Sequence, residues 1–145
     1  MDADAQKLAE ATGVAMYSRD RASQALGMSL EEIRPGYARM RMLVREDMVN
    51  GHNLCHGGLI FTLADSTFAF ACNSYNQSTV AAGCSIEFLA PARLGDVLVA
   101  TGDEQALVGR SGVYDIRVED QNGRLIAMFR GKSTRIRGEV ISGLA

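Results

Sequence analysis

The chain has 145 residues, of which 47% are hydrophobic and 22% charged, and its net charge is -2. This length predicts a single domain, residues 1–145, that is large enough to bury one hydrophobic core. A charge so close to neutral gives no general attraction to nucleic acid or to an anionic membrane. We therefore expect neither as a partner.

The expected absence of an export signal and the spacing of the cysteines favour a location in the reducing cytoplasm. The first residues lack a basic segment followed by an apolar core and a cleavage site, so we predict no export signal. Cys55, Cys72 and Cys84 show no CxxC spacing, which argues against a disulfide framework and against a zinc site. The apolar run 59–72 is shorter than the roughly 20 residues that span a bilayer and contains Asp65, so we expect a buried helix.

The first half of the chain changes from a helical period to a strand period. Apolar residues at helical spacing predict a helix over about residues 5–18, and the segment RASQALGM (21–28) adds a short turn that Gly27 ends. From Tyr37 the period is two. This predicts a half-buried strand over 37–45, with one face formed by Ala38, Met40, Met42 and Val44.

The second half predicts one central helix followed by strands. A glycine-punctuated loop leads into residues 57–73, which are almost uniformly apolar, as in a helix surrounded by protein. Strand-like runs follow at 80–88, 97–101, 112–120 and 124–136, and the Asn122-Gly123 pair favours a hairpin turn. We therefore predict an α+β domain: an antiparallel sheet of about five strands wrapped around one long central helix, preceded by an N-terminal helix.

Such a domain leaves one sheet edge and part of its helix uncovered. Burial of both against a second copy by two-fold symmetry is the expected remedy. The chain is therefore predicted to form a homodimer.

Asp65 is a carboxylate within the apolar helix, and an ionised carboxylate there is costly unless it is paired or used. One interpretation is an aspartate that points into water or meets a basic side chain. The other depends on His56, Gly57 and Gly58 at the helix start. Glycines there leave backbone N–H groups open where the helix dipole favours negative charge, so the amides can form an oxyanion hole, although glycine also suits a tight turn.

Helix geometry limits how these groups can act together. At about 1.5 Å per residue, Asp65 lies roughly 12 Å along the axis from the Gly57 amide, so one carbonyl cannot contact both within a chain. If they cooperate, they come from two subunits with antiparallel central helices. Asn50 and His56 flank the loop and can orient water or a carbonyl, or can simply hold the loop. For His52 we expect only solvent.

Seven segments carry a family resemblance that covers nearly all of the chain after the first helix. They are NGH (50–52), CHGG (55–58), LAD (63–65), FAFACNS (68–74), IEFLAPARLGD (86–96), GVYDIRVED (112–120) and FRGKSTRI (129–136). Together they resemble the hotdog-fold acyl-CoA thioesterases, specifically the PaaI family of phenylacetic acid degradation thioesterases.

The resemblance implies a hotdog subunit that pairs through its sheet edges into a double hotdog and assembles further into a homotetramer. It implies hydrolysis of acyl-CoA thioesters, with phenylacetyl and ring-hydroxylated phenylacetyl groups as the suggested acyl groups, without a metal or other cofactor. By position, Asp65 is the general base or nucleophile and Gly57 supplies the carbonyl-binding amide. Asn50 and His56 are polar site residues.

CoA phosphates need cationic partners, and basic residues in the second half of the chain are candidates. Each is equally suited to be a solvated charge that protects a strand edge. The candidates are Arg110, Arg130, Lys132, Arg135 and Arg137.

Three alternatives remain beside the thioesterase interpretation. A catalytic triad of Cys55, His56 and Asp65 is disfavoured because adjacent residues rarely set a thiol against an imidazole. A hotdog dehydratase or hydratase is disfavoured because Asn50 and the HGG segment favour attack on the carbonyl itself. A non-catalytic acyl-CoA-binding module is disfavoured by a suitably placed Asp65.

The aromatic residues give no clear acyl pocket. Phe68, Tyr75 and Phe88 could line a pocket or fill the core, and we assign them to the core.

Overall fold

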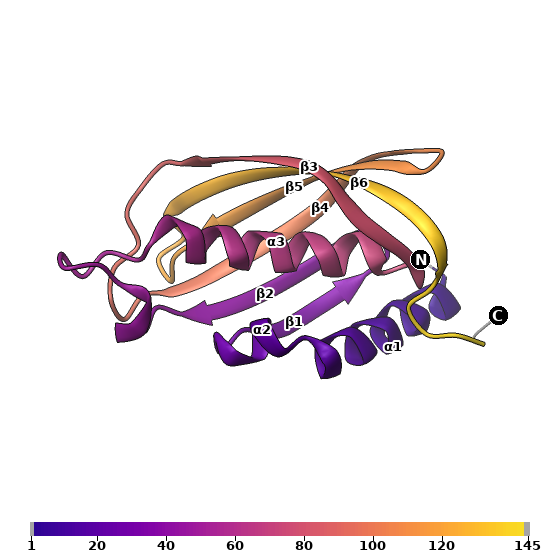
Figure 1. The fold of residues 1–145 in the computed structure, drawn as a ribbon, viewed down its shortest axis with the longest axis horizontal. Coiled ribbons are helices and arrows are strands. Elements are labelled where there is room, and N and C mark those ends of the chain that lie inside the picture. The colour runs from indigo at the N-terminus through magenta and orange to yellow at the C-terminus, as the bar shows by residue number, and fades with distance from the viewer. Residues whose placement is uncertain (1, 144–145) are drawn as a thin grey trace.

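The computed structural model describes residues 2–143, which form a sheet curled around one long helix (Figure 1). Six strands and three α-helices are present among these residues. The helices are α1 (Ala3–Arg19), α2 (Arg21–Ala25) and α3 (Gly57–Asn73), and a short 3-10 turn, η1, covers Glu46–Met48. The strands are β1 (Ser29–Arg34), β2 (Tyr37–Leu43), β3 (Gln77–Phe88), β4 (Val97–Val108), β5 (Ser111–Glu119) and β6 (Leu125–Glu139).

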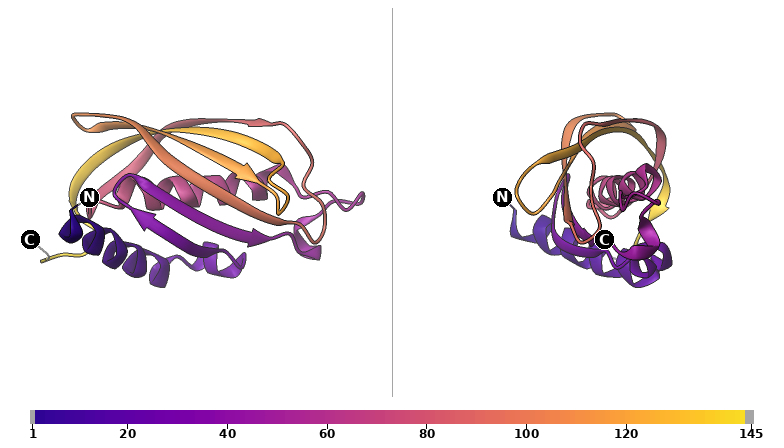
Figure 2. Two further views of the ribbon diagram at one scale, coloured as in Figure 1. Left: turned by 180° about the vertical axis from the view of Figure 1, so that it is seen from behind. Right: turned by 90° about the vertical axis from the view of Figure 1, so that its left-hand side faces the viewer.

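The sheet is antiparallel throughout, with the strand order β1-β2-β4-β5-β6-β3. Seen along the helix, it bends around α3 on several sides, while α1 lies outside against β1 (Figure 2). The inner face of the sheet and the covered side of α3 form the core. This is the α+β architecture that the sequence predicts.

The core is built from large apolar side chains of α3 and of the strands that surround it. Phe68 in α3 packs against Tyr114 and Phe129, with ring centroids 5.7 and 5.8 Å apart. Gly131 allows this approach, because a Cβ atom there would lie 2.7 Å from the Phe68 ring. The core assignment of Phe68 is therefore confirmed, with only 1% of the residue exposed.

The strand predicted over 37–45 is confirmed as β2, which ends two residues earlier at Leu43, and the central helix over 57–73 is confirmed. In β2, Ala38, Met40 and Met42 are fully buried, as the period of two requires. Helix α3 has the predicted bounds. The four later runs correspond to β3 through β6, and Gly123 adopts the positive φ, 77°, that a tight turn needs.

Strand β1 was not predicted from the sequence. Its register against β2 shifts between Leu30 and Glu32, so Glu31 lies in a β-bulge. The bulge separates Leu30 and Ile33 by three residues and breaks the period of two by which a strand is detected. The sheet therefore has one strand more than the five predicted.

One edge and one side of the helix stay open, as expected for a sheet with a single central helix. Strand β3 lies at the sheet edge, and most of its residues are exposed. Along α3, an incompletely covered stripe follows helical spacing through Gly58, Thr62, Asp65 and Ala69. These two surfaces are available to a second copy of the chain.

Among residues 2–143, no helix combines the length and the apolar character needed to cross a lipid bilayer.

Candidate active site

The candidate active site is a hollow of about 400 Å³ beside the start of α3. Asn50 and Gly57 both line it, so the structure brings two of the predicted site residues together. The other lining residues have apolar side chains or, at Cys55, a thiol, and their backbone adds polar surface; they are Leu54, Cys55, Ile60, Phe88, Leu89, Ala90, Pro91 and Ala92.

Backbone hydrogen bonds fix the loop that enters the helix. The Cys55 N–H donates to the carbonyl of Ala92 at 2.8 Å, and the His56 N–H donates to the carbonyl of Met48 at 2.9 Å. The loop is thus tied on one side to the turn η1 and on the other to the segment that follows β3. Because both ties come directly before Gly57, the first amides of α3 have a defined position.

The Gly57 amide has no hydrogen-bond acceptor among the described residues. His56 is the N-cap residue, and its side chain caps nothing. Leu59 and Ile60 donate to the His56 carbonyl, whereas the N–H groups of Gly57 and Gly58 donate to no acceptor within residues 2–143. Open amides at a helix start, where the dipole is positive, stabilise a developing negative charge.

Asn50 has both a loop role and a free donor. Its Oδ1 accepts hydrogen bonds from the N–H groups of His52 and Leu54, at 2.9 and 3.1 Å. Its Nδ2 has no hydrogen-bond partner in the described part of the chain. The side chain is therefore held by its oxygen while its N–H₂ group remains available to a ligand.

Both histidines are exposed, and neither side chain has a hydrogen-bond partner among the described residues. The expectation that His52 faces solvent is confirmed. His56 acts on the site through its backbone, which starts α3, and the structure gives its imidazole no fixed orientation. Its predicted side-chain role stays a prediction.

Asp65 lies half-buried in the middle of α3 and does not line the hollow. The carboxylate of Asp65 forms no hydrogen bond or ion pair with any side chain or amide within residues 2–143. Desolvation by burial raises the pKa of this carboxyl above its ordinary value. Within one chain, Asp65 therefore lies away from the hollow that Gly57 lines, as the rise of the helix predicts.

Cys55 does not have the setting of a nucleophile. Burial raises the pKa of its thiol to about 11, so the thiol is neutral at physiological pH. Its Sγ donates to the carbonyl of His56 at 3.5 Å and meets no imidazole. The cysteine triad is therefore contradicted by the structure.

The basic residues proposed for CoA phosphates do not line the hollow in a single chain. Arg130 forms a two-pronged ion pair with Asp115, at 2.6 and 2.7 Å, and these hydrogen bonds lower the pKa of the Asp115 carboxyl. Arg135 lies over the ring of Tyr75, 5.4 Å from its centroid. Arg110 and Lys132 are exposed.

Phe88 lines the candidate site, and its assignment to the core from the sequence pattern is wrong. In the structure 52% of the residue is exposed, and it lines the hollow. Tyr75, which was also assigned to the core, is only half-buried. The available signal for Phe88 was its position at the end of a strand, directly before the irregular segment that contains Pro91.

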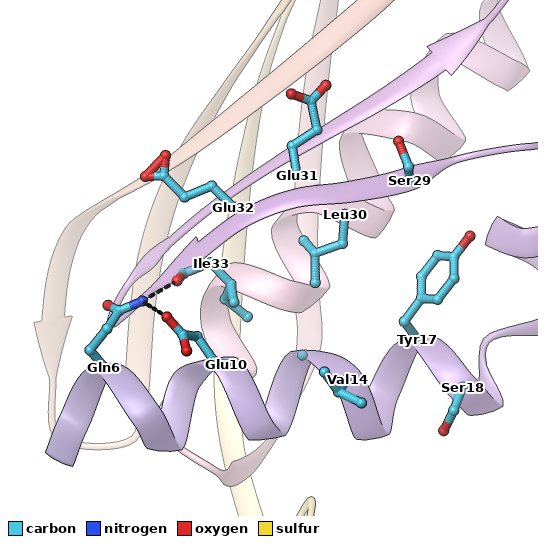
Figure 3. Close-up of a pocket in the computed structure, with 11 residues that line it drawn as sticks. Gln6, Glu10, Val14, Tyr17, Ser18, Ser29, Leu30, Glu31, Glu32 and Ile33 are labelled. Atoms are coloured by element: carbon cyan, nitrogen blue, oxygen red, sulfur yellow. Dashed lines mark hydrogen bonds between the residues drawn. The ribbon is translucent and has the colours of Figure 1, made fainter. Parts of the chain in front are cut away.

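A larger groove, of about 650 Å³, separates α1 from β1 (Figure 3). Leu30 and Ile33 point from β1 toward α1, and the Gln6 amide donates to the carbonyl of Ile33 at 2.9 Å. Two of its carboxylates, Glu31 and Glu32, pair with arginines of β1 and β2. The groove contains neither the open α3 amides nor Asp65, so the hollow at Gly57 remains the candidate active site.

Comparison with known proteins identifies the family. The model of the thioesterase superfamily matches residues 52–127. The chain is 44% identical over 126 residues to acyl-coenzyme A thioesterase PaaI of Escherichia coli (strain K12), which covers 87% of this chain and 90% of that protein. The chain belongs to the PaaI family of hotdog-fold acyl-CoA thioesterases. It is therefore a thioester hydrolase.

Solved structures agree with this assignment. The PaaI protein from the phenylacetic acid degradation operon of E. coli superposes with a TM-score of 0.91 at 42% identity, covering 92% of this chain and 97% of that one. A variant of the phenylacetic acid degradation protein PaaI from Thermus thermophilus gives 0.77 at 33% identity, covering 81% of this chain and 100% of that one. The predicted hotdog fold is thus confirmed, and the family favours thioester hydrolysis over hydration or binding alone.

The two ends of the Asn50 amide can be separated by substitution. Asn50→Asp keeps an oxygen for the N–H groups of His52 and Leu54 but removes the free donor. We expect near-parental thermal unfolding and turnover lowered about 10²-fold, the cost of a lost donor in an acyl-transfer site. Asn50→Ala loses both functions and should also unfold at a lower temperature. Parental turnover in Asn50→Asp, read by thiol release, would limit Asn50 to the loop.

Proposed function

We propose that the chain hydrolyses phenylacetyl-CoA and ring-hydroxylated phenylacetyl-CoA to the free acid and CoA, in the catabolism of phenylacetate. The E. coli relative comes from a phenylacetic acid degradation operon, and the T. thermophilus relative is named for the same process, which supports this substrate class. The reaction takes place in the cytoplasm, consistent with three free cysteines. The Gly57 amide, open beside a hollow lined mainly by apolar side chains, carries the chemical part of the proposal.

The active unit is a homodimer with two equivalent sites, and two dimers form a homotetramer as the family resemblance implies. The open edge of β3 and the uncovered stripe of α3 support the dimer, because one two-fold axis lets a second copy cover both. Antiparallel α3 helices then bring Asp65 of one subunit opposite the partner subunit's Gly57. This arrangement spans the roughly 12 Å that one helix leaves between the two groups.

The thioester carbonyl oxygen accepts a hydrogen bond from the Gly57 N–H. In the tetrahedral intermediate this oxygen carries a negative charge, which the amide and the helix dipole stabilise without reorganisation. The free Nδ2 of Asn50 holds the attacking water or the carboxylate. His56 contacts the thioester or holds the loop.

Asp65 from the facing subunit acts as the general base. It takes a proton from water as the water oxygen attacks the carbonyl carbon, and it returns that proton to the sulfur as the C–S bond breaks. Half-burial supports this role, because a carboxylate with a raised pKa is a stronger base than an exposed one. In the alternative route Asp65 attacks the carbonyl directly, the C–S bond breaks with loss of the CoA thiolate, and water then opens the resulting mixed anhydride to the free acid and Asp65.

The mechanism assigns water activation to Asp65 and uses no cofactor beyond the CoA of the substrate. Arg110, Lys132 and Arg135 are the stronger candidates for contacts with the CoA phosphates, since the guanidinium of Arg130 already pairs with Asp115.

A panel of acyl-CoA esters tests the substrate assignment. Thiol release should give a kcat/KM for phenylacetyl-CoA and its ring-hydroxylated forms at least about tenfold above that for straight-chain esters, because an aryl group adds apolar and aromatic contact. Acetyl-CoA and hexanoyl-CoA serve as controls for acyl length. A preference for the straight chains would refute the phenylacetate assignment and leave the thioesterase family intact.

Asp65→Asn should lower turnover by about 10² to 10⁴, the range of a lost acid-base group. In the parent enzyme, turnover should fall as the pH drops through the raised pKa of Asp65, at a higher pH than for an exposed carboxyl of about 3.9. The acidic limb should disappear in the variant. A pH profile of kcat/KM measures both effects, and turnover within threefold of the parent would remove Asp65 from the chemistry.

Urea unfolding provides the folding control for the same variant. A raised native pKa means that ionised Asp65 destabilises the folded state at neutral pH, and that this cost fades as the pH falls through the native pKa. Asp65→Asn should therefore be at least as stable as the parent at pH 7. A variant that is both inactive and less stable would point to misfolding instead.

Mixed dimers test whether each site draws on two subunits. Asp65→Asn inactivates one parent, and Gly57→Pro inactivates the other by removing the N–H at the first helical position, where the helix ladder does not need it and where the added ring must displace Phe88. Each mixed dimer then has one intact site, so random mixing should restore up to about a quarter of parental turnover. Gly57→Ala, which keeps the N–H, controls for the added side chain. Mixtures that regain no activity although subunits exchange would contradict the composite site.

A further inference from the structure

Phe88 is an exposed aromatic side chain beside the open amide. The other four phenylalanines of the chain are buried or half-buried, whereas Phe88 is 52% exposed. It closes the end of β3 and lines the same hollow as Gly57 and Asn50. Large apolar side chains that stay exposed in a hollow commonly mark a surface that something else covers.

The ring of Phe88 stands where a side chain at position 57 would project. A Cβ atom at Gly57 would lie 3.1 Å from Cζ and 3.3 Å from Cε1 of Phe88. The neighbouring Gly58 shows no such contact, because a Cβ there would meet nothing within 4 Å. Of the two glycines, only Gly57 lets the ring approach the backbone at the start of α3.

The backbone of Phe88 is fixed, while its ring stays outside the aromatic core. Phe88 pairs with Ala127 across the sheet, and the next N–H, that of Leu89, donates to the carbonyl of Ile126 at 2.8 Å. The ring contacts among the described residues join Phe61, Phe68, Tyr114 and Phe129, and they do not include Phe88. One side of the ring rests on Gly57, and the other side faces the hollow.

We infer that Phe88 is a specificity-determining residue whose ring forms the apolar wall for the acyl group of the substrate. The inference rests on the proposed function, in which the thioester oxygen binds the Gly57 N–H. A donor-acceptor distance of about 2.7 to 3.1 Å holds the carbonyl carbon and its first substituents close to Gly57, and Phe88 is the side chain that a Cβ atom at this residue would contact.

The chemistry of the hollow assigns the wall to the acyl group and not to the pantetheine arm of CoA. Besides Asn50, the lining side chains are aliphatic, aromatic or a neutral thiol, and the polar surface of the hollow comes from the backbone. Several of these backbone N–H groups, at Leu54, Cys55 and Leu89, already donate within the chain and are not free for the two amides of pantetheine. An arylacetyl group needs no hydrogen bonds, and its ring can pack against the Phe88 ring in an offset or edge-to-face arrangement. Phe88 therefore selects flat aryl groups over short acyl groups.

Substitutions at Phe88 test this on a matched pair of esters, phenylacetyl-CoA and acetyl-CoA. Phe88→Ala should lower kcat/KM for phenylacetyl-CoA about 10-fold or more, mainly through KM, and change that for acetyl-CoA by less than about threefold. Phe88→Tyr keeps the ring and should keep the preference. Phe88→Leu keeps apolar bulk without a ring and should lose part of the preference for phenylacetyl-CoA. Val108→Ala, at a still more exposed apolar residue in the distant β4–β5 hairpin, should match the parent.

A double-mutant cycle tests the contact itself. Gly57→Ala places a methyl group against the ring, so its effect on phenylacetyl-CoA should arise largely from displacing Phe88. In a Phe88→Ala background the same methyl group should then cost about threefold or less. If the double variant instead loses kcat/KM by the product of the two single losses, the contact between the ring and Gly57 does not govern the position of the substrate.

The outcomes separate this inference from the proposed function. A parent enzyme that hydrolyses neither ester defeats the proposed function. A parent that prefers phenylacetyl-CoA, with a Phe88→Ala variant that retains the preference, defeats only the inference. If Phe88→Ala lowers kcat/KM equally for both esters, the ring contacts the pantetheine arm, and the inference is also overturned. Size-exclusion chromatography shows whether each variant keeps the parental oligomeric state. If Phe88→Ala does not, the ester preferences of Phe88→Leu and Phe88→Tyr are compared instead, and equal preferences would overturn the inference.

Discussion

The continuous helix α3 fixes the distance between an open amide at Gly57 and a carboxylate at Asp65. Its residues 57–73 form one unbroken element, so the two groups stay roughly 12 Å apart along the axis. A thioester spans only a few bonds, and a single chain cannot bring both groups to it. If both groups act on one thioester, as proposed, they come from two subunits, and the same dimer covers the edge of β3 and one side of α3.

Partial burial raises the pKa of both Asp65 and Cys55, with opposite chemical consequences. Desolvation raises the pKa of Asp65, which remains accessible and becomes a stronger base. Desolvation also raises the pKa of Cys55, to about 11, but the thiol then stays protonated and faces only a backbone carbonyl. The same physical effect thus supports the proposed role of Asp65 as a base and leaves the Cys55 thiol neutral.

Local patterns predicted most of the fold, and irregular positions account for the misses. The alternation in β2 and the apolar run of α3 gave correct elements because each buries a face with a regular period. In β1 the bulge at Glu31 interrupts that period, and the strand went undetected. Phe88 was misassigned for a related reason: an apolar residue at a strand end has the same sequence pattern whether it faces the core or a hollow.

The sequence by itself determined the family, the central helix and the separation of Gly57 from Asp65, because these depend on short motifs and on helix geometry. Only the tertiary structure decided which side chains meet around the hollow. Asn50 joins Gly57 there because hydrogen bonds from the loop to Met48 and Ala92 fold the chain back, and Phe88 arrives from a strand that begins after the helix. Contacts between residues so far apart along the chain arise from packing, which no local pattern encodes.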